Sequence, residues 1–160
     1  MKSLIFCTSA KLVRSAAAGN GARKRVSYPA ATPGVIGVSA LGHAGRVPPG
    51  TVSALAEATP RGSDPADYLA AFSNCGPEIS ATGPGVGIVS CHPGDRYSVE
   101  DGTSMAAPVV TGLAARALSQ RPDLLSAARD QQRADAVRTL LLGTARNLGF
   151  EAIDVGRGLP

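Results

Sequence analysis

Apolar positions follow two different rhythms along this chain, and the rhythm changes near residue 105. Before that point the apolar residues form short runs bounded by glycine and proline, and the run Val35–Ala40 is typical of a strand buried in a parallel sheet. Two further strands are expected at Glu78–Gly83 and Val86–Cys91, both interpreted as buried on two faces. A fourth strand is expected at Arg96–Glu100.

After Met105 the apolar residues return at helical spacing. They are Val109, Val110, Leu113, Ala114, Ala117 and Leu118. This spacing predicts a helix that is capped by Thr103 and ends near Pro122. A second helix is predicted over residues 127–142, with Gly143 as its stop. Strands that lead into helices predict an α/β fold.

One long stretch has neither rhythm. Leu41–Tyr68 is rich in glycine, proline and small polar residues, so it is interpreted as an excursion between ordered parts. No internal repeat is found in the chain.

Composition indicates a single globular domain with closely packed elements. The chain has 160 residues, 44% of them apolar and only 4% aromatic, and it contains no tryptophan. The net charge is +4, but the basic residues are scattered except for the cluster 23–25. A nucleic-acid surface needs a basic patch with interleaved aromatic residues, so this class of partner is not expected.

The cysteines and the N-terminus add little chemistry. Cys75 and Cys91 either form a disulfide or are two small, partly buried thiols, and no spacing that includes Cys7 indicates a metal site. The N-terminal apolar run Leu4–Phe6 is much shorter than the roughly 7–15 residues of a secretory signal or the roughly 18 of a membrane span. We therefore expect no targeting segment, no membrane anchor and no metal ligands in this sequence.

The stretch DGTSMAAPVV, residues 101–110, carries the strongest chemical signal. Ser104 falls in the first turn of the predicted helix, where backbone N–H groups are unpaired and the helix dipole favours negative charge. Such a place suits a nucleophile, although a serine there is also an ordinary helix cap. Residues 102–112 resemble the G-T-S-M-A-x-P-x-V-x-G signature around the nucleophilic serine of the subtilisin-like serine proteases, the subtilases.

Three more segments resemble the same family in the same order. They are AAGN at residues 17–20 followed by YPA at 28–30 and PGVI at 33–36, then FSNCG at 72–76 with TGPGVGIVS at 82–90, and GRGL at 156–159. The resemblance covers residues 16–159 and leaves 42–67 unmatched. It implies a subtilisin-like three-layer α/β/α sandwich with a mainly parallel sheet, of which the N-terminal part is missing.

The resemblance also implies roles for single residues. Ser104 is expected to be the nucleophile, and the Asn20 side chain is expected to donate to the oxyanion beside it. Ala17, Ala18 and Gly19 are expected to form part of the wall of a substrate pocket. The family often has a cis peptide before the proline of Y-P, so Tyr28–Pro29 is expected to be cis. Calcium occurs in the family, but no residue here supports it.

The acid and base of a catalytic triad are not found in this sequence. His43 and His92 lie in segments unlike the family's histidine motif, and no aspartate precedes Asp64, whereas subtilases have the order Asp, His, Ser. Residues 1–15 also differ from the usual lead-in, because Arg14 would fall in a strand that is central in the family. We interpret 1–15 as an atypical lead-in and 16–160 as the C-terminal portion of a catalytic domain.

Two functions follow from the resemblance. The first is a serine endopeptidase that acts on polypeptides through an acyl-enzyme on Ser104 but needs an N-terminal part for activity. The second is a non-catalytic remnant that at most binds extended peptide. In either case the isolated chain is expected to hydrolyse peptides poorly and to expose apolar surface.

Overall fold

A mixed sheet built around one long strand organises this protein. The computed structural model describes residues 12–47 and 57–160. The central strand is β2 (Ile36–His43), which is buried along all but its last residue. One edge of β2 pairs in parallel with β5 (Ile79–Pro84). The start of its other edge pairs in parallel with β1 (Ser15–Ala17).

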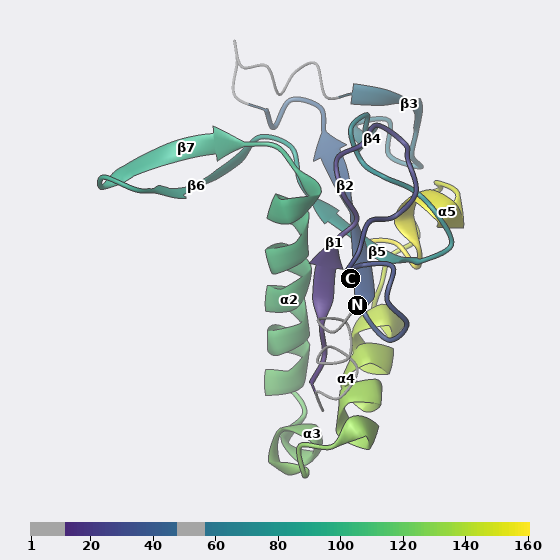
Figure 1. The fold of residues 1–160 in the computed structure, drawn as a ribbon, viewed down its shortest axis with the longest axis vertical. Helices are drawn as coiled ribbons and strands as arrows, with labels where there is room; N and C mark the ends of the chain where they lie inside the picture. The colour runs from purple at the N-terminus through teal and green to yellow at the C-terminus, as the bar shows by residue number, and fades with distance from the viewer. Residues whose placement is uncertain (1–11, 48–56) are drawn as a thin grey trace.

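The remaining strands are antiparallel. β4 (Asp67–Ala70) pairs with the last residues of β2, and β3 (Glu57–Arg61) pairs with β4. β6 (Ile88–His92) and β7 (Arg96–Glu100) form a separate two-stranded ribbon that extends away from the sheet (Figure 1). The sheet therefore has parallel pairs at its centre and antiparallel pairs at its end.

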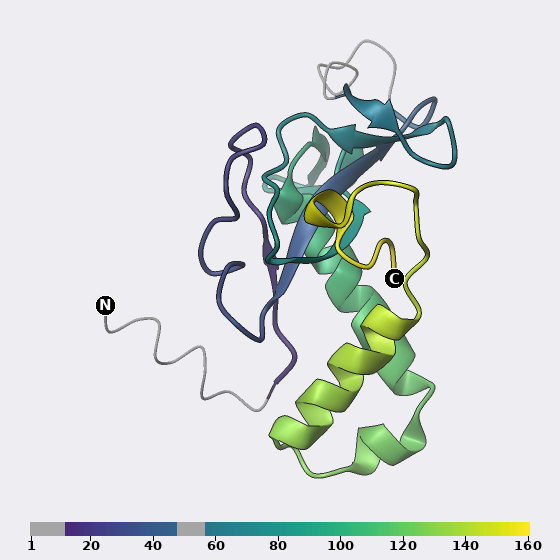
Figure 2. The ribbon, with the colours of Figure 1, turned by 90° about the vertical axis from the view of Figure 1, so that its right-hand side faces the viewer.

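Two long helices lie side by side and cover one face of the sheet (Figure 2). α2 (Thr103–Ser119) contacts β1, β2 and β5, and α4 (Gln131–Gly143) packs against α2. The short helix α3 (Pro122–Ser126) connects them, and α5 (Ala152–Val155) packs against β5.

The main core lies between β2 and α2. Alternate residues of β2, among them Ile36 and Val38, point towards α2 and meet Ala106 and Val110, and all four are at most 1% exposed. The small side chain of Ala106 lets the helix approach the strands closely, as the scarcity of aromatic residues predicts. Burying such side chains stabilises the fold by about 25 cal/mol for each Å² of apolar surface removed from water.

The opposite face of β2 packs against a long loop. Ala18, Val26 and Ala30 of this loop form a second cluster with Ile79 at the start of β5. Three predictions about the structure are confirmed: an α/β fold, a buried strand after Pro33, and close packing through small residues.

The strand predictions were accurate at the centre of the sheet and wrong at its margin. The interpretation of Leu41–Tyr68 as an excursion is wrong in part, because β2 runs to His43 and both β3 and the start of β4 lie within this stretch. β2 includes most of the predicted Val35–Ala40 and continues to His43, and β5 lies within one residue of the predicted Glu78–Gly83. The expectation that Val86–Cys91 is buried on both faces is wrong, because β6 is exposed along most of its length. A short apolar run has the same pattern in a buried strand and in a projecting ribbon, so the sequence could not separate them.

The helix predictions needed correction at their ends. The cap of α2 is Gly102 rather than Thr103, whose side chain is used elsewhere. The second predicted helix, residues 127–142, begins later than expected: α4 starts after Asp130, whose side chain accepts a hydrogen bond from the Arg133 N–H. The separate short helix α3, which begins at Pro122, was not predicted. The Asp130 cap explains the later start of α4, and Pro122 in the first turn of α3 is a helix start signal that the sequence interpretation did not use.

Further predictions concern the cysteines, membrane-spanning helices and the N-terminal residues. Cys75 and Cys91 are both free thiols, so the disulfide alternative is not realised. Among the described residues no helix is long and apolar enough to cross a membrane. Cys7, the apolar run Leu4–Phe6 and the start of the predicted lead-in lie outside the described residues.

The edge of the sheet at β1 has an unusual polar group. Arg14 directly precedes β1 and its carbonyl accepts a hydrogen bond from the Ile36 N–H at 2.8 Å. Its guanidinium Nε and Nη1 atoms are buried and have no hydrogen-bond partner within the described residues. A buried donor without a partner loses its water and gains nothing in exchange, which costs about 1–3 kcal/mol. Arg14 therefore weakens the edge at which β1 pairs with β2.

We predict that Arg14→Met stabilises this chain, because methionine keeps the length of the side chain and removes the unpaired donors. The expected gain in the free energy of unfolding is about 1–3 kcal/mol, measured by urea denaturation. Arg129→Met is the matched control, since Arg129 is exposed, and it is expected to change little. A loss of stability in Arg14→Met would mean that the guanidinium has a favourable partner.

Candidate active site

Ser104 is presented to solvent at the start of a helix. It is the second residue of α2, its side chain is exposed, and both neighbours on its N-terminal side, Gly102 and Thr103, are buried. Within the described residues neither its hydroxyl nor its backbone N–H has a hydrogen-bond partner. The first turn of α2 contains no acidic residue, so the partial positive charge at the helix N-terminus is not neutralised there.

Asn20 is held directly beside this helix start. Its Oδ1 atom accepts hydrogen bonds from the Thr103 N–H at 3.0 Å and from the Thr103 hydroxyl at 2.9 Å. The same Thr103 hydroxyl oxygen accepts a hydrogen bond from the Gly19 N–H at 3.1 Å. These two bonds fix the orientation of the side-chain amide, and its Nδ2 has no hydrogen-bond partner in the described part of the chain. The structure thus brings Asn20 and Ser104 together, as predicted.

Two free N–H groups approach one point in space. A Cβ atom added to Gly102 would lie 3.2 Å from the Asn20 Nδ2 atom and 3.6 Å from the Ser104 backbone nitrogen. Gly102 has a φ of 161°, which is extended backbone that any residue can adopt. Glycine matters at this position because it has no side chain, not because the backbone makes a turn. A side chain at this position would fill the space between the two donors. The Met105 Sδ atom lies 3.4 Å from the same point, so this thioether borders the space together with the two N–H groups. An oxyanion needs preorganised donors of this kind.

Thr103 is the residue that sequence reasoning missed. Its side chain is 1% exposed and connects the loop after β1 with the start of α2. The sequence does show a threonine with a hydroxyl group between Gly102 and Ser104. Helix capping explained it equally well, and only the structure shows that its hydroxyl points to Gly19 and Asn20.

Asn74 is a second residue whose role only the structure reveals. It is 3% exposed, and its Nδ2 donates to the carbonyls of Ala18 and Arg25 at 3.2 and 3.0 Å. Its Oδ1 accepts from the Gly21 N–H at 2.8 Å, and its backbone N–H donates to the Gly19 carbonyl at 2.9 Å. These contacts fix the loop on both sides of Asn20.

The predicted wall residues have unequal positions. Ala18 is 0% exposed and packs in the second core cluster, whereas Ala17 and Gly19 are half-buried. Gly19 has a φ of +103°, and a Cβ there would lie 2.5 Å from Asn74 Nδ2. Only glycine fits this position. The peptide bond Tyr28–Pro29 is cis, as expected.

Neither histidine contacts Ser104. His92 lies at the end of β6 in the projecting ribbon, where its Nδ1 is 3.2 Å from the Pro93 carbonyl. His43 lies at the end of β2 and contacts Asp67. Among the described residues no imidazole or carboxylate is hydrogen-bonded to Ser104. In the described part of the chain, the site therefore holds an exposed hydroxyl and two unpaired N–H groups, with no base hydrogen-bonded to the hydroxyl.

Curated relatives of this chain are proteases that are considerably longer. It is 36% identical over 143 residues to the halolysin-like extracellular serine protease Nep of Natrialba magadii, a match that covers 89% of this chain and 21% of that protein. It is 34% identical over 152 residues to subtilisin DY of Bacillus licheniformis, covering 92% and 44% of the two. The chain spans between 21% and 45% of the length of such relatives.

Solved structures share the fold. The structure of the prenylagaramide maturation protease PagA matches with a TM-score of 0.66 and 23% identity, covering 99% of this chain and 51% of that one. The PatG macrocyclase domain matches with a TM-score of 0.67 and 24% identity, covering 99% and 43%. At this level of identity the likeness establishes a common α/β fold of the subtilisin type.

The family follows from the sequence match together with this fold. Residues 6–158 match the sequence model of the subtilase family, peptidase S8, a range that begins within the segment interpreted as a lead-in. All the motifs discussed above lie within it except the last residue of GRGL. The chain belongs to the subtilase family.

Proposed function

We propose that this chain is the nucleophile-bearing part of a serine endopeptidase that hydrolyses peptide bonds through an acyl-enzyme on Ser104. The observation that carries the proposal is the pairing of the exposed Ser104 with the free Asn20 amide, held together by Thr103. Family membership and the proteases among the curated relatives support the same reaction class.

The proposed chemistry uses the groups at the start of α2. The Ser104 oxygen attacks the carbonyl carbon of the substrate peptide, and its proton passes to a base. The negative charge that develops on the carbonyl oxygen is stabilised by the Asn20 Nδ2–H and the Ser104 backbone N–H, which approach the space beside Gly102. The amine leaves after it receives the proton, and water then hydrolyses the ester.

The proposed substrate is a polypeptide in extended conformation. Ala17, Ala18 and Gly19 directly precede Asn20, so we propose that this segment forms part of the wall for the residue before the cleaved bond. Ala17 and Gly19 are the half-buried members and would meet the substrate, while Ala18 supports them from the core. The small side chains leave space for a substrate group.

We propose that a further polypeptide segment supplies the base and its aspartate. It would cover the β1 edge of the sheet, where an apolar cavity of about 210 Å³ opens between β1, α2 and α4. Leu12, next to this edge, is 56% exposed, and the buried Arg14 guanidinium there has unpaired donors. A partner with apolar side chains and an acidic group would satisfy both features.

The alternative function is a non-catalytic subtilase remnant that binds extended peptide. The lack of a described base beside Ser104 favours it, and the open edge of β1 offers backbone groups for strand addition. The two functions differ in whether Ser104 becomes catalytic once a base is supplied.

We predict that the isolated chain shows no peptide hydrolysis above that of its Ser104→Ala variant. Without a base the serine hydroxyl is a weak nucleophile, and loss of triad members lowers rates by about 10⁴ to 10⁶. The measurement is turnover of a mixed fluorogenic peptide library at matched protein concentration. Turnover typical of a serine protease that disappears in Ser104→Ala would contradict the prediction.

A complementary N-terminal segment of a subtilase, carrying the aspartate and histidine, is predicted to stabilise this chain and to restore turnover. The measurements are a thermal melt and peptide hydrolysis with and without the segment. In the restored enzyme Asn20→Ala is expected to lower kcat by about 10²–10³ with little change in KM, as for other oxyanion donors. Stabilisation without turnover would support the non-catalytic alternative.

We predict that Thr103→Val weakens the fold and displaces Asn20, because it keeps the shape of the side chain and removes the bridging hydroxyl. The expected loss is about 1–3 kcal/mol in the free energy of unfolding, since the part-buried Gly19 N–H loses its partner and the buried Thr103 side chain no longer donates to Asn20. Thr103→Ser is the matched control and should retain most of the stability. Equal unfolding curves for Thr103→Val and the parent chain would show that the bridge has no structural role.

A further inference from the structure

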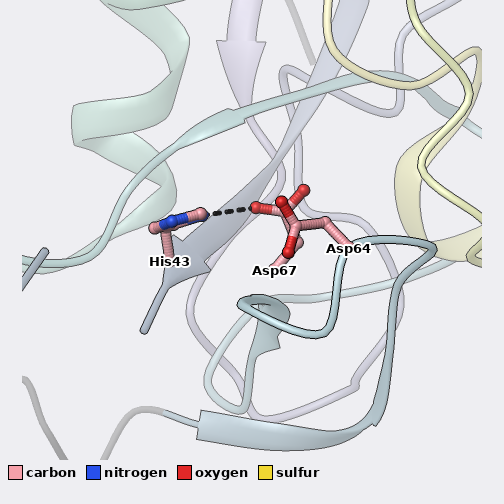
Figure 3. Close-up of side chains that lie close together, drawn as sticks. All are labelled: His43, Asp64 and Asp67. Carbon is pink, nitrogen blue, oxygen red and sulfur yellow. Dashed lines mark hydrogen bonds and ion pairs between the residues drawn. The ribbon is translucent and has the colours of Figure 1, made fainter. Parts of the chain in front are cut away.

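Three side chains with metal-binding chemistry meet at the far end of β2. His43 is the last residue of β2 and is the register partner of Asp67, the first residue of β4, while Asp64 belongs to the turn that precedes β4. Each offers one ligand atom, and these atoms all lie within 4.8 Å of one another. Figure 3 shows the imidazole and the two carboxyl groups turned towards one another.

The sheet and the turn fix this cluster in place. The His43 Nδ1 atom is 2.8 Å from Asp67 Oδ1, and the Asp67 side chain is only 7% exposed. The turn is held by the Asp67 N–H, which donates to the Asp64 carbonyl at 3.0 Å, and by the Ala66 N–H, which donates to Asp64 Oδ1 at 2.9 Å. Little reorganisation is needed to bring the three side chains onto one ion.

The donor set selects a class of metal. One imidazole nitrogen with two carboxylate oxygens suits Zn²⁺ and related divalent transition ions, which bind such atoms at about 2.0–2.2 Å. Ligand atoms of a tetrahedral ion are then about 3.3–3.6 Å apart, which lies between the 2.8 Å contact and the 4.8 Å limit of the cluster. The ion would take the place of the direct hydrogen bond between His43 Nδ1 and Asp67 Oδ1.

We propose that His43, Asp64 and Asp67 bind one divalent transition-metal ion, with Zn²⁺ as the best-suited example. His43 and Asp67 line a cavity of about 380 Å³, which leaves room for water at the fourth position. Ser104 does not line this cavity, so the metal site is independent of the proposed peptidase reaction. Sequence reasoning found no metal ligands because the histidine and the aspartates are separated by an excursion without a known spacing.

Two guanidinium groups oppose the binding of a cation. Arg146 Nη2 is 3.8 Å from Asp67 Oδ2, and Arg46 lines the same cavity. The Arg146 side chain is 65% exposed, so it can turn away into water when an ion binds. Removing its charge should strengthen metal binding, whereas a purely structural His43–Asp67 ion pair makes no such prediction.

The test uses the full chain in a Cys91→Ser, His92→Ala background, because an exposed thiol next to an imidazole could bind zinc by itself. Zn²⁺ is titrated by calorimetry, and Co²⁺ is added to read the ligand geometry from its visible absorption. We expect one equivalent of Zn²⁺ and a tetrahedral Co²⁺ spectrum. Asp64→Asn keeps the acceptor for the Ala66 N–H and should weaken Zn²⁺ binding at least tenfold, as should His43→Ala.

Arg146→Gln serves as the opposing variant and is expected to tighten Zn²⁺ binding severalfold. Because Asp64 and Arg146 are exposed, both variants should fold, and far-ultraviolet circular dichroism checks this. Zn²⁺ affinity that is unchanged in both Asp64→Asn and His43→Ala would overturn the proposal. Loss of binding in the background variant itself would assign the ion to Cys91 and His92 and would overturn it equally.

Discussion

The hydroxyl of Thr103 is the contact on which the candidate site depends. It accepts from Gly19 and donates to Asn20, and so it joins two segments that are 84 residues apart in the sequence. With Oδ1 of Asn20 fixed in this way, the amide nitrogen has one direction left, towards the space beside Gly102. The orientation of the Asn20 amide thus depends on a buried hydroxyl.

The Thr103 hydrogen bonds require that both α2 and the loop that carries Asn20 are held in place. α2 is anchored by the packing of Ala106 and Val110 against β2, and the loop that carries Asn20 is anchored by Asn74. Each anchor is buried, so water does not compete with its hydrogen bonds and the donors are preorganised. Ser104 and Asn20, which belong to these two anchored segments, are both exposed.

The fold of this protein does not by itself determine which reaction it catalyses. The α/β fold is shared with PagA and the PatG macrocyclase domain, yet a fold hosts different chemistries, and the function must be argued from the site. The site contains an exposed serine beside two N–H groups that have no partner in the described part of the chain, whereas His43 and His92 lie elsewhere. At the β1 edge of the sheet, buried Arg14 donors have no hydrogen-bond partner among the described residues.

The sequence alone determined the family, the α/β class, the centre of the sheet, and the meeting of Asn20 with Ser104, because these depend on local patterns and on ordered motifs. It could not place the β6–β7 ribbon in solvent, since an apolar run looks the same whether or not another layer covers it. Only the tertiary structure assigned Thr103 and Asn74 their partners and brought His43 to Asp64 and Asp67. Side-chain hydrogen bonds between distant segments have no period in the sequence, because the fold decides which polar groups become neighbours.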